Sequence, residues 1–309
     1  MVAPARITLV RAPNPSPLTL SGTNSYLIDC GQGRGVCIDP GPAIESHVEA
    51  LVHSARRANL RIEQILITHG HPDHAPAAAP LARRTGASIG AHPQLAMPHD
   101  LDLHDGEALS IGACEFVTVD APGHTFDHVV FYESSQRALF TGDVVLGEGT
   151  VVVAPPGGAM RPYQATLERL AREFSEARRI YGGHGEPVDD PQAKLREYIE
   201  HRRMREAQLV DALRSGPRTI PEFVEDVYAQ TDRILWPAAA RQVLAHLIAL
   251  EQEGRVRSRA IERPMTAAES AILNPDWATT LAAADAKLVE AELGTVMRLD
   301  AILSYELVS

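Results

Sequence analysis

The sequence predicts a layered α/β fold followed by a smaller, mainly helical domain. Through about residue 190, short β-type runs alternate with amphipathic helical segments, the order typical of layered α/β architecture. The pattern of alternating strands and helices ends near Pro191, where a long charged helical segment begins. The chain has 309 residues, too many for one small domain, and its 45% of apolar residues suffices for a sizeable core.

Glycine and proline divide the first half of the chain into short strands. We expect strands over residues 6–10, 25–29 and 36–39, the last followed by the turn Pro40-Gly41-Pro42. Apolar residues at helical spacing predict a helix over 44–58, before a strand over 64–68. Pro72 is typical of a helix start, and the alanine-rich residues 75–84 should continue that helix. Further elements follow in order: strands over 87–91, 108–110, 115–120, 129–133 and 138–141, a helix over 161–174, and a strand over 179–181.

The second half reads as a winged helix. A long helix over 192–213 and helices over 219–229 and 236–253 precede a short basic β-ribbon over 254–260, which is the order helix, helix, helix, hairpin. The remaining tail predicts a helix over 279–292 and a strand-like end over 296–307. We therefore expect an α/β domain over 1–190, a winged-helix-like domain over 191–263, and an extension of unknown role over 264–309.

Charge and hydropathy narrow the class of protein. The net charge of −11 argues against a chain that coats nucleic acid over its whole surface, although residues 192–263 carry 13 basic against 11 acidic residues. No apolar run approaches the ~20 residues of a membrane span, and the N-terminal residues lack the roughly 7–15-residue apolar stretch of a signal peptide. We expect a cytoplasmic protein without membrane contacts.

The three cysteines form no C-x-x-C pair, and their number is odd. Cys30 and Cys37 flank a glycine-rich turn, so they should lie on the two arms of a hairpin. We expect all three cysteines, Cys114 included, to be small buried side chains in a reducing compartment rather than disulfide partners.

Four potential metal ligands fall within six residues, directly after the apolar run 62–67. This H-x-H-x-D-H loop holds His69, His71, Asp73 and His74. Imidazole nitrogens and carboxylate oxygens are ligands that zinc prefers, and burying four such groups unpaired would cost several kcal/mol. The loop therefore predicts a metal site.

One loop cannot supply every ligand of two ions, so the other ligands should follow other strands. Three places qualify: His124 in Pro122-Gly123-His124, Asp143 after Gly142, and His184 between Gly183 and Gly185. Each lies beside glycine, where the backbone can approach an ion closely. Each signal is weak alone, because a glycine-flanked histidine is usually a loop residue.

Taken in this order, the motifs resemble the metallo-β-lactamase superfamily over about residues 6–190. The resemblance implies a four-layer αβ/βα sandwich with the site at one edge of the two sheets. It assigns one zinc to His69, His71 and His124. It assigns a second zinc to Asp73, His74 and His184, with Asp143 bridging the two ions. Asp39 matches the family's aspartate that orients a ligand histidine.

A narrower resemblance, to the β-lactamase-like protein 2 branch, rests on residues 14–27, 123–128 and 146–150. That branch carries a C-terminal winged-helix-like domain, which agrees with residues 192–263. Its animal members are implicated in cleavage of single-stranded RNA, whereas fungal relatives release acyl chains from carrier proteins. Ala75-Pro76-Ala77-Ala78 replaces the Gly-Gly that often follows the ligand loop, but the ligands themselves are retained.

The resemblance implies a dinuclear zinc hydrolase with two ions about 3.5–4 Å apart and a hydroxide bridging them. Zinc lowers the pKa of bound water to about 7, so no serine or cysteine nucleophile is needed. Asp73 or Asp143 would handle the proton, and the sequence does not choose between them. His128 has two interpretations, a hydrogen bond to an oxyanion or a purely structural role. Iron or manganese would suit the same ligands.

Three functions fit these observations. The first is endonucleolytic cleavage of single-stranded RNA, supported by the winged-helix-like domain and by basic clusters at 202–205 and 255–259. The second is hydrolysis of a small-molecule acyl thioester or another activated acyl group, including weak β-lactam hydrolysis, which needs a narrower apolar pocket. The third is a non-catalytic metal- and nucleic-acid-binding protein, but structural zinc sites are usually closed by four Cys or His ligands. The basic ribbon or the tail would also suit a homodimer contact.

Overall fold

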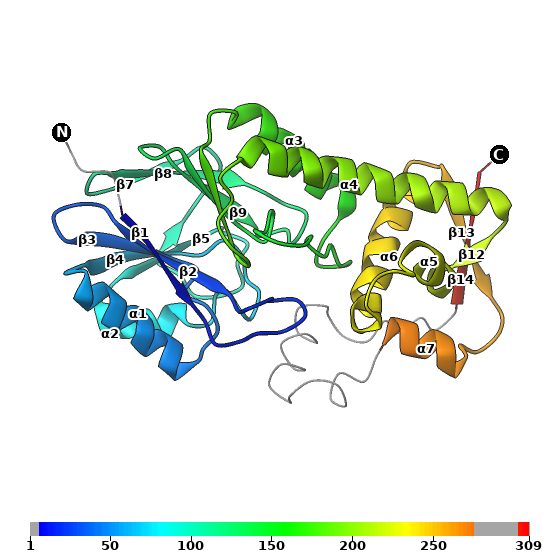
Figure 1. The fold of residues 1–309 in the computed structure, drawn as a ribbon, viewed down its shortest axis with the longest axis horizontal. Helices are drawn as coiled ribbons and strands as arrows, with labels where there is room; N and C mark the ends of the chain where they lie inside the picture. The colour runs from blue at the N-terminus through cyan, green and yellow to red at the C-terminus, as the bar shows by residue number, and fades with distance from the viewer. Residues whose placement is uncertain (1–5, 275–301, 309) are drawn as a thin grey trace.

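The computed structural model describes residues 6–274 and 302–308. Two sheets with their covering helices form one part of the molecule, and a helical part with a small sheet forms the other (Figure 1). The long helix α4 (Pro191–Ala212) runs from the first part to the second. None of the described helices is both long and apolar enough to cross a bilayer.

The first sheet has six strands in sequence order. They are β1 (Arg6–Arg11), β2 (Asn24–Asp29), β3 (Arg34–Ile38), β4 (Arg61–Leu66), β5 (Ser88–Ala91) and β6 (Leu101–Asp102). The β1–β2–β3 pairs are antiparallel, and the pairs from β3 to β6 are parallel. Helices α1 (Glu45–Arg57) and α2 (Ala78–Thr85) connect the parallel strands and pack their apolar faces on this sheet.

The second sheet has five strands in the order β11-β10-β9-β8-β7. They are β7 (Ala108–Ile111), β8 (Cys114–Asp120), β9 (Val129–Glu133), β10 (Ala138–Gly142) and β11 (Arg179–Gly182). Helix α3 (Met160–Glu173) and the first half of α4 cover its outer face. Because β8, β10 and β11 run in the same direction, their carboxyl ends share one edge of the sheet.

Between the two sheets lies a core of aromatic and branched side chains. Tyr26 and Phe140, one from each sheet, meet edge to face with ring centroids 5.5 Å apart. Phe116 and Phe131 are also almost fully buried there. The order helices, sheet, sheet, helices confirms the four-layer αβ/βα sandwich that the sequence resemblance implied.

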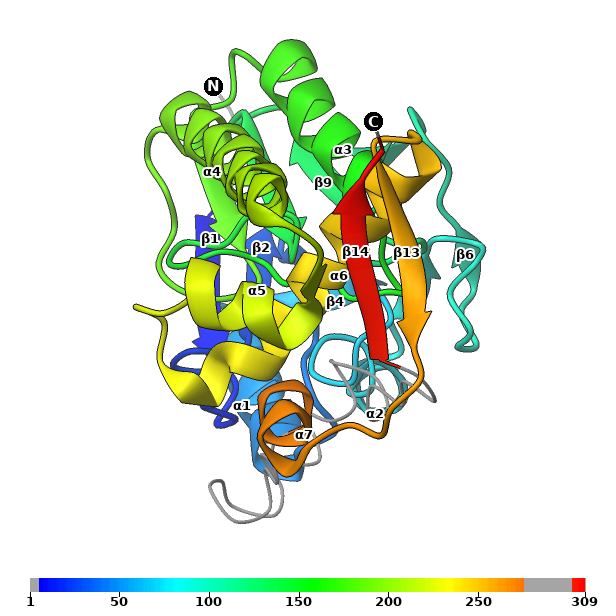
Figure 2. The ribbon, with the colours of Figure 1, turned by 90° about the vertical axis from the view of Figure 1, so that its right-hand side faces the viewer.

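The C-terminal part has its own core around α5 (Ile220–Val227), α6 (Trp236–Gln252) and α7 (Ala267–Leu273). Its sheet has the order β12-β14-β13, from strands β12 (Arg218–Thr219), β13 (Val256–Ile261) and β14 (Ile302–Leu307). The expected winged-helix-like domain is confirmed, with β13 and β14 side by side in Figure 2. The expected ribbon within residues 254–260 is wrong, since the partner of β13 comes from the tail.

The tail predicted from residue 264 onward thus contributes α7 and β14 to this core. The strand-like end is confirmed over Ile302–Leu307. The helix expected over 279–292 lies outside the described residues.

Two other predictions need correction. Helix α2 begins at Ala78 rather than at Pro72, because Pro76 disfavours helical backbone at the residue before it.

Cys30 and Cys114 form a disulfide, so the expectation of reduced thiols is wrong for this pair, whereas Cys37 is free and buried as expected. The turn after β2 packs against the β7–β8 turn, where the Ala113 N–H donates to the Cys30 carbonyl at 2.7 Å. The short strand β6 was not predicted.

Tyr305 on β14 tests whether the tail is part of the C-terminal core. Its side chain is 1% exposed on the central strand of the small sheet. We expect Tyr305→Ala to lower the free energy of unfolding by about 3–5 kcal/mol, because a large buried ring would leave a cavity. Urea unfolding followed by circular dichroism measures this. Val308→Ala, at a side chain 46% exposed, is the control; equal stability of the two variants would contradict the packing described here.

Candidate metal centre

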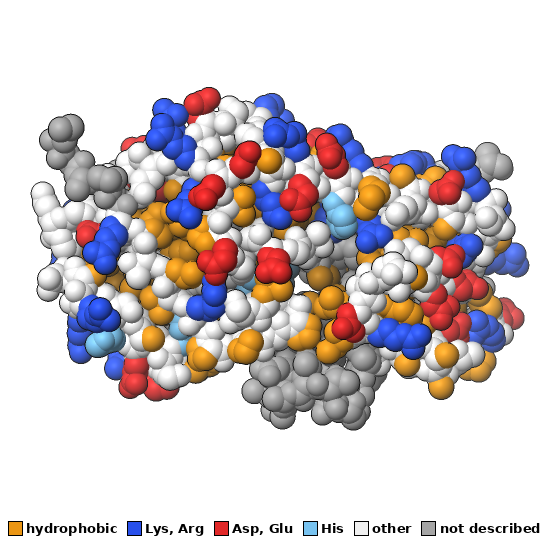
Figure 3. All heavy atoms as spheres, viewed as in Figure 1, with side chains coloured by type: hydrophobic (Ala, Val, Ile, Leu, Met, Phe, Trp, Pro, Cys, Tyr) orange, Lys and Arg blue, Asp and Glu red, His pale blue; other side chains and the backbone are white. Residues whose placement is uncertain are grey.

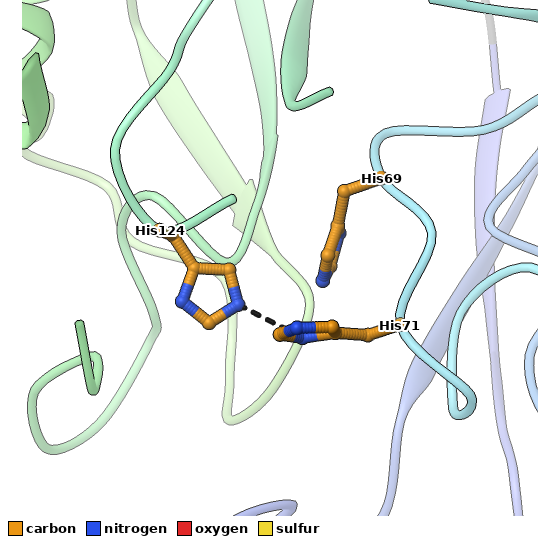
Figure 4. Close-up of side chains that lie close together, drawn as sticks. All are labelled: His69, His71 and His124. Atoms are coloured by element: carbon orange, nitrogen blue, oxygen red, sulfur yellow. Dashed lines mark hydrogen bonds between the residues drawn. The ribbon is translucent and has the colours of Figure 1, made fainter. Parts of the chain in front are cut away.

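The predicted ligands converge at one edge of the two sheets. The H-x-H-x-D-H loop follows β4, and the other three ligands follow β8, β10 and β11. In Figure 4 the rings of His69, His71 and His124 point toward one another from two separate segments. Strand ends from both sheets thus bring together residues as far apart in sequence as Asp73 and His184.

Three histidines form the first group. One ligand nitrogen from each of His69, His71 and His124 lies within 4.8 Å of the others. His124 Nε2 is 3.0 Å from His71 Nδ1, while His124 Nδ1 is 2.8 Å from the Val152 carbonyl oxygen. The carbonyl holds the ring of His124 so that its Nε2 faces the group.

Asp73, His74 and His184 form the second group, and their ligand atoms also lie within 4.8 Å of one another. His74 Nε2 is 3.2 Å and His184 Nε2 is 3.3 Å from Asp73 Oδ2. Asp143 lies between the two groups: its Oδ2 is 3.4 Å from His184 Nε2 and 3.8 Å from His124 Nε2. This is the place that the bridging assignment requires.

Asp39 supports the second group from behind. Its carboxylate accepts hydrogen bonds from the Thr68 N–H at 2.8 Å and the Thr68 hydroxyl at 2.7 Å, and lies 2.9 Å from His74 Nδ1. The backbone of Asp39 has φ +48°, a left-handed conformation that non-glycine residues keep only where their surroundings enforce it. These contacts fit the orienting role expected of Asp39.

Thr23 was not predicted as a site residue. Its hydroxyl donates to Asp73 Oδ2 at 2.8 Å and is therefore the aspartate's nearest support. The sequence signal was present, because Thr23 lies within the stretch 14–27 that resembles the β-lactamase-like protein 2 branch, but that stretch had no assigned role.

Burial and mutual contacts set the charges of the groups. Burial, reinforced by the neighbouring histidines, lowers the pKa of His69 well below its usual range and that of His71 to about 3. Burial alone would raise the pKa of Asp143, but His184 and His74 hold it well below its usual range. Burial opposes the charge on His184, yet Asp143 and Asp73 raise its pKa to about 10. The two carboxylates therefore require positive charge beside them.

The site also contains buried polar atoms without hydrogen-bond partners, which a cation could bind. His69 Nε2, His74 Nε2 and Asp143 Oδ1 are buried without a hydrogen-bond partner in the described structure, although His74 Nε2 has carboxylate oxygens nearby. A Cβ at Gly183 would lie 2.3 Å from Asp143 Oδ1 and 2.6 Å from His74 Cε1, so only glycine fits there. With its nitrogen and oxygen donors, this cluster can bind metal ions such as zinc.

His128 lies beside this cluster rather than within it. Its side chain is 1% exposed and stacks on His69, with ring centroids 4.6 Å apart. Its Nε2 accepts the Asp143 N–H at 3.1 Å. The geometry favours the structural interpretation of His128, because that nitrogen already fixes the backbone of a ligand.

A cavity of about 810 Å³ opens from the centre toward the C-terminal part. His71, His124 and Asp143 line one end, and apolar side chains such as Leu18 and Val152 line its walls. The far side comes from α4 and α6 and from the segment between α5 and α6. Leu146 and residues 148–152 line it as well, and Gly149 and Thr150 are exposed. A substrate at the cluster would thus contact both parts of the molecule.

Comparisons with known proteins agree with this architecture. Residues 18–184 match the Metallo-beta-lactamase superfamily, and residues 219–263 match the Beta-lactamase associated winged helix domain. The Beta-lactamase-like protein 2 homolog of Drosophila melanogaster is 32% identical over 262 residues, covering 79% of this chain and 87% of that protein. Lactamase-like protein adaB of Aspergillus niger is 33% identical over 237 residues, covering 70% of each.

Solved structures show the same fold. A metallo-beta-lactamase family protein from Thermus thermophilus superposes with a TM-score of 0.69 at 24% identity, over 82% of this chain and 95% of that chain. A beta-lactamase domain protein from Burkholderia ambifaria gives a TM-score of 0.70 at 20% identity, over 85% and 91%. With its sequence matches and its His and Asp cluster, the chain belongs to the metallo-β-lactamase superfamily and is a metal-dependent hydrolase.

Proposed function

We propose that this hydrolase binds two zinc ions and cleaves an activated acyl group, with a thioester as its substrate class. The cavity that opens on His71, His124 and Asp143 carries the proposal. Its volume of about 810 Å³ lies within the roughly 300–1,000 Å³ typical of small-molecule sites. Apolar side chains such as Leu18 and Val152 form part of its wall, and an apolar surface is what an acyl chain needs and an RNA strand does not.

His69, His71 and His124 would hold one zinc, and Asp73, His74 and His184 the other, with Asp143 between them. When bound, two zinc ions supply Lewis acidity and a water of lowered pKa. Asp143 lines the cavity, whereas Asp73 is 1% exposed and bonded to Thr23. We therefore assign proton transfer at the reacting carbonyl to Asp143, while Asp39 and His128 keep the ligands in place.

Single-stranded RNA is the second candidate, favoured by the winged-helix-like domain and by arginines on the cavity wall. Three of the six arginines in the basic clusters that suggested RNA are paired with carboxylates, however. Arg203 pairs with Glu168, and Arg255 pairs with both Glu206 and Glu253. Basic and acidic side chains are interspersed over the face in Figure 3. Paired arginines are less suited to binding successive phosphates.

Metal content is the first test. We expect the purified protein to hold two zinc ions per chain by elemental analysis, and His71→Ala to lose zinc and at least ~100-fold in activity, because a ligand between the cavity and the ion is removed. His53→Ala, at an exposed histidine on α1, is the matched control and should change neither. Unchanged activity in His71→Ala would place the chemistry elsewhere; iron or manganese in the sample would correct the metal.

Asp39→Asn tests the support of the ligands. Asparagine keeps the shape of Asp39 but loses the charge that faces His74, so we expect zinc affinity to fall about 10–100-fold, measured by competition with a chelating dye. Asp29→Asn, at a hairpin turn where the carboxylate accepts the Gly31 N–H, should leave the affinity unchanged. Equal affinities of the two variants would show that Asp39 does not tune the metal site.

Substrate class is tested by a direct comparison. The zinc-loaded protein should release thiol from acyl-coenzyme A, measured with a thiol reagent, and cleave a single-stranded RNA oligonucleotide at low salt far more slowly or not at all. A β-lactam serves as a third substrate, and His71→Ala gives the background rate of each assay. Efficient RNA cleavage without thiol release would replace our proposal by the second candidate.

A further inference from the structure

The far wall of the cavity is basic. Arg202 and Arg205, one turn apart on α4, line it together with His201 from the same helix and Tyr228 after α5. At the opposite end the cavity reaches the ligand histidines and Asp143. The only other carboxylate along its described lining, Glu148, is exposed at the rim.

Arg202 is buried without a countercharge. Its side chain is 1% exposed, its Nη2 donates to the Val151 carbonyl at 2.6 Å, and its guanidinium lies 5.1 Å from the ring centroid of Tyr163. Its Nε is buried without a hydrogen-bond partner. A guanidinium in such a place is costly unless an anion joins it. Arg202 belongs to the basic cluster 202–205 of the sequence, yet its side chain is buried.

Arg205 repeats the pattern one turn further on. It stacks on Tyr228 at 4.5 Å and donates to the Val227 carbonyl and to Gln208, and its Nε is unpartnered. Among the described residues no carboxylate forms an ion pair with Arg202 or Arg205. Glu206, the next residue of the helix, instead pairs with Arg161 and Arg255.

His201, beside these arginines, is neutral mainly because it is partly buried. Burial, followed by the charges of Arg202 and Arg205, lowers the pKa of His201 to about 4. His201 therefore stays neutral at physiological pH, and the arginines remain the cationic groups of this wall together with Arg241, which donates to the Pro237 carbonyl.

We propose that Arg202 and Arg205 bind a phosphate group on the thiol arm of the thioester substrate. Planar guanidinium forks match phosphate oxygens, and two adjacent arginines can share one phosphate. The acyl carbonyl then lies at the metal end while the phosphate lies at the α4 end. This proposal rests on the proposed function: water adds to the thioester carbonyl, the C–S bond breaks, and carboxylate, thiol and one proton leave. A phosphopantetheine arm, as in coenzyme A, has this chemistry.

Matched substrates measure the phosphate directly. Butyryl-coenzyme A and butyryl-4′-phosphopantetheine carry phosphate, whereas butyryl-pantetheine has the same thioester without it. We expect kcat/KM for the phosphorylated substrates to exceed that for butyryl-pantetheine about 10-fold or more, mainly through KM. In Arg205→Gln, and in Arg202→Gln if it folds, this ratio should fall toward one while turnover of butyryl-pantetheine is retained. Equal use of the first two substrates would place the recognised phosphate on the pantetheine arm rather than on the nucleotide.

The control variants separate charge from folding. Arg203→Gln changes an exposed arginine on the same helix and should keep the wild-type ratio. Arg202→Lys keeps a positive charge and should retain part of the preference. Zinc content and circular dichroism confirm that each variant is folded and loaded. A wild-type ratio near one, or a ratio unaffected by the Arg205 and Arg202 variants, overturns the phosphate site even if thioesters are hydrolysed.

Binding without turnover separates this site from the reaction. In calorimetry with the zinc-loaded full chain, 4′-phosphopantetheine should bind about 10-fold or more tightly than pantetheine, and Arg205→Gln should abolish the difference. That result without any thioesterase activity would uphold the phosphate site and refute the proposed reaction. If instead only an RNA oligonucleotide binds in an arginine-dependent way, the phosphate belongs to a nucleic acid and the proposal is wrong.

Discussion

The attraction between two buried carboxylates and the cations that must balance them is the constraint on which the site depends. Asp73 and Asp143 lie in the same small space at the sheet edge, where their mutual repulsion is poorly screened. In the protein alone, His74 and His184 supply the balancing charge, because both carboxylates raise the pKa of each ring. Metal ions would take over that task. The strand ends and the Asp39 contacts keep these side chains close enough for either protonated histidines or metal ions to balance the two carboxylates.

Most of the candidate metal ligands could be named from the sequence, because they are clustered in one loop or lie beside glycine. His69 to His74 needed only one loop, and Gly183 has no room for a side chain beside Asp143, so the glycine beside His184 has a steric cause. His128 was harder, because the same residue type at the same spacing can face a substrate or a neighbouring ring. Only the stacking on His69 and the bond from the Asp143 N–H separate these roles.

The errors have a common origin in contacts between distant segments. Strand β13 pairs with β14, more than forty residues later, and Cys30 meets Cys114 across a separation of 84 residues. Neither partner can be found from local periodicity. Arg202 belongs to a basic cluster of the sequence, but its side chain donates to the Val151 carbonyl in the segment after β10 and lies over the Tyr163 ring of α3. Local composition describes a helix face poorly when another element covers it.

The position of the C-terminal part relative to the two sheets depends on the number of residues in helix α4. Leu195 and Tyr198 pack in the core of the second sheet, while Leu209 packs in the C-terminal core, and the helix is continuous between them. Each residue of an α-helix turns the chain by about 100°. Inserting or deleting one residue between Tyr198 and Leu209 would swing the C-terminal part around the helix axis and carry Arg205 off the cavity wall. Exposed side chains of this segment, such as Arg203, can vary, but its residue count is locked to the shape of the cavity.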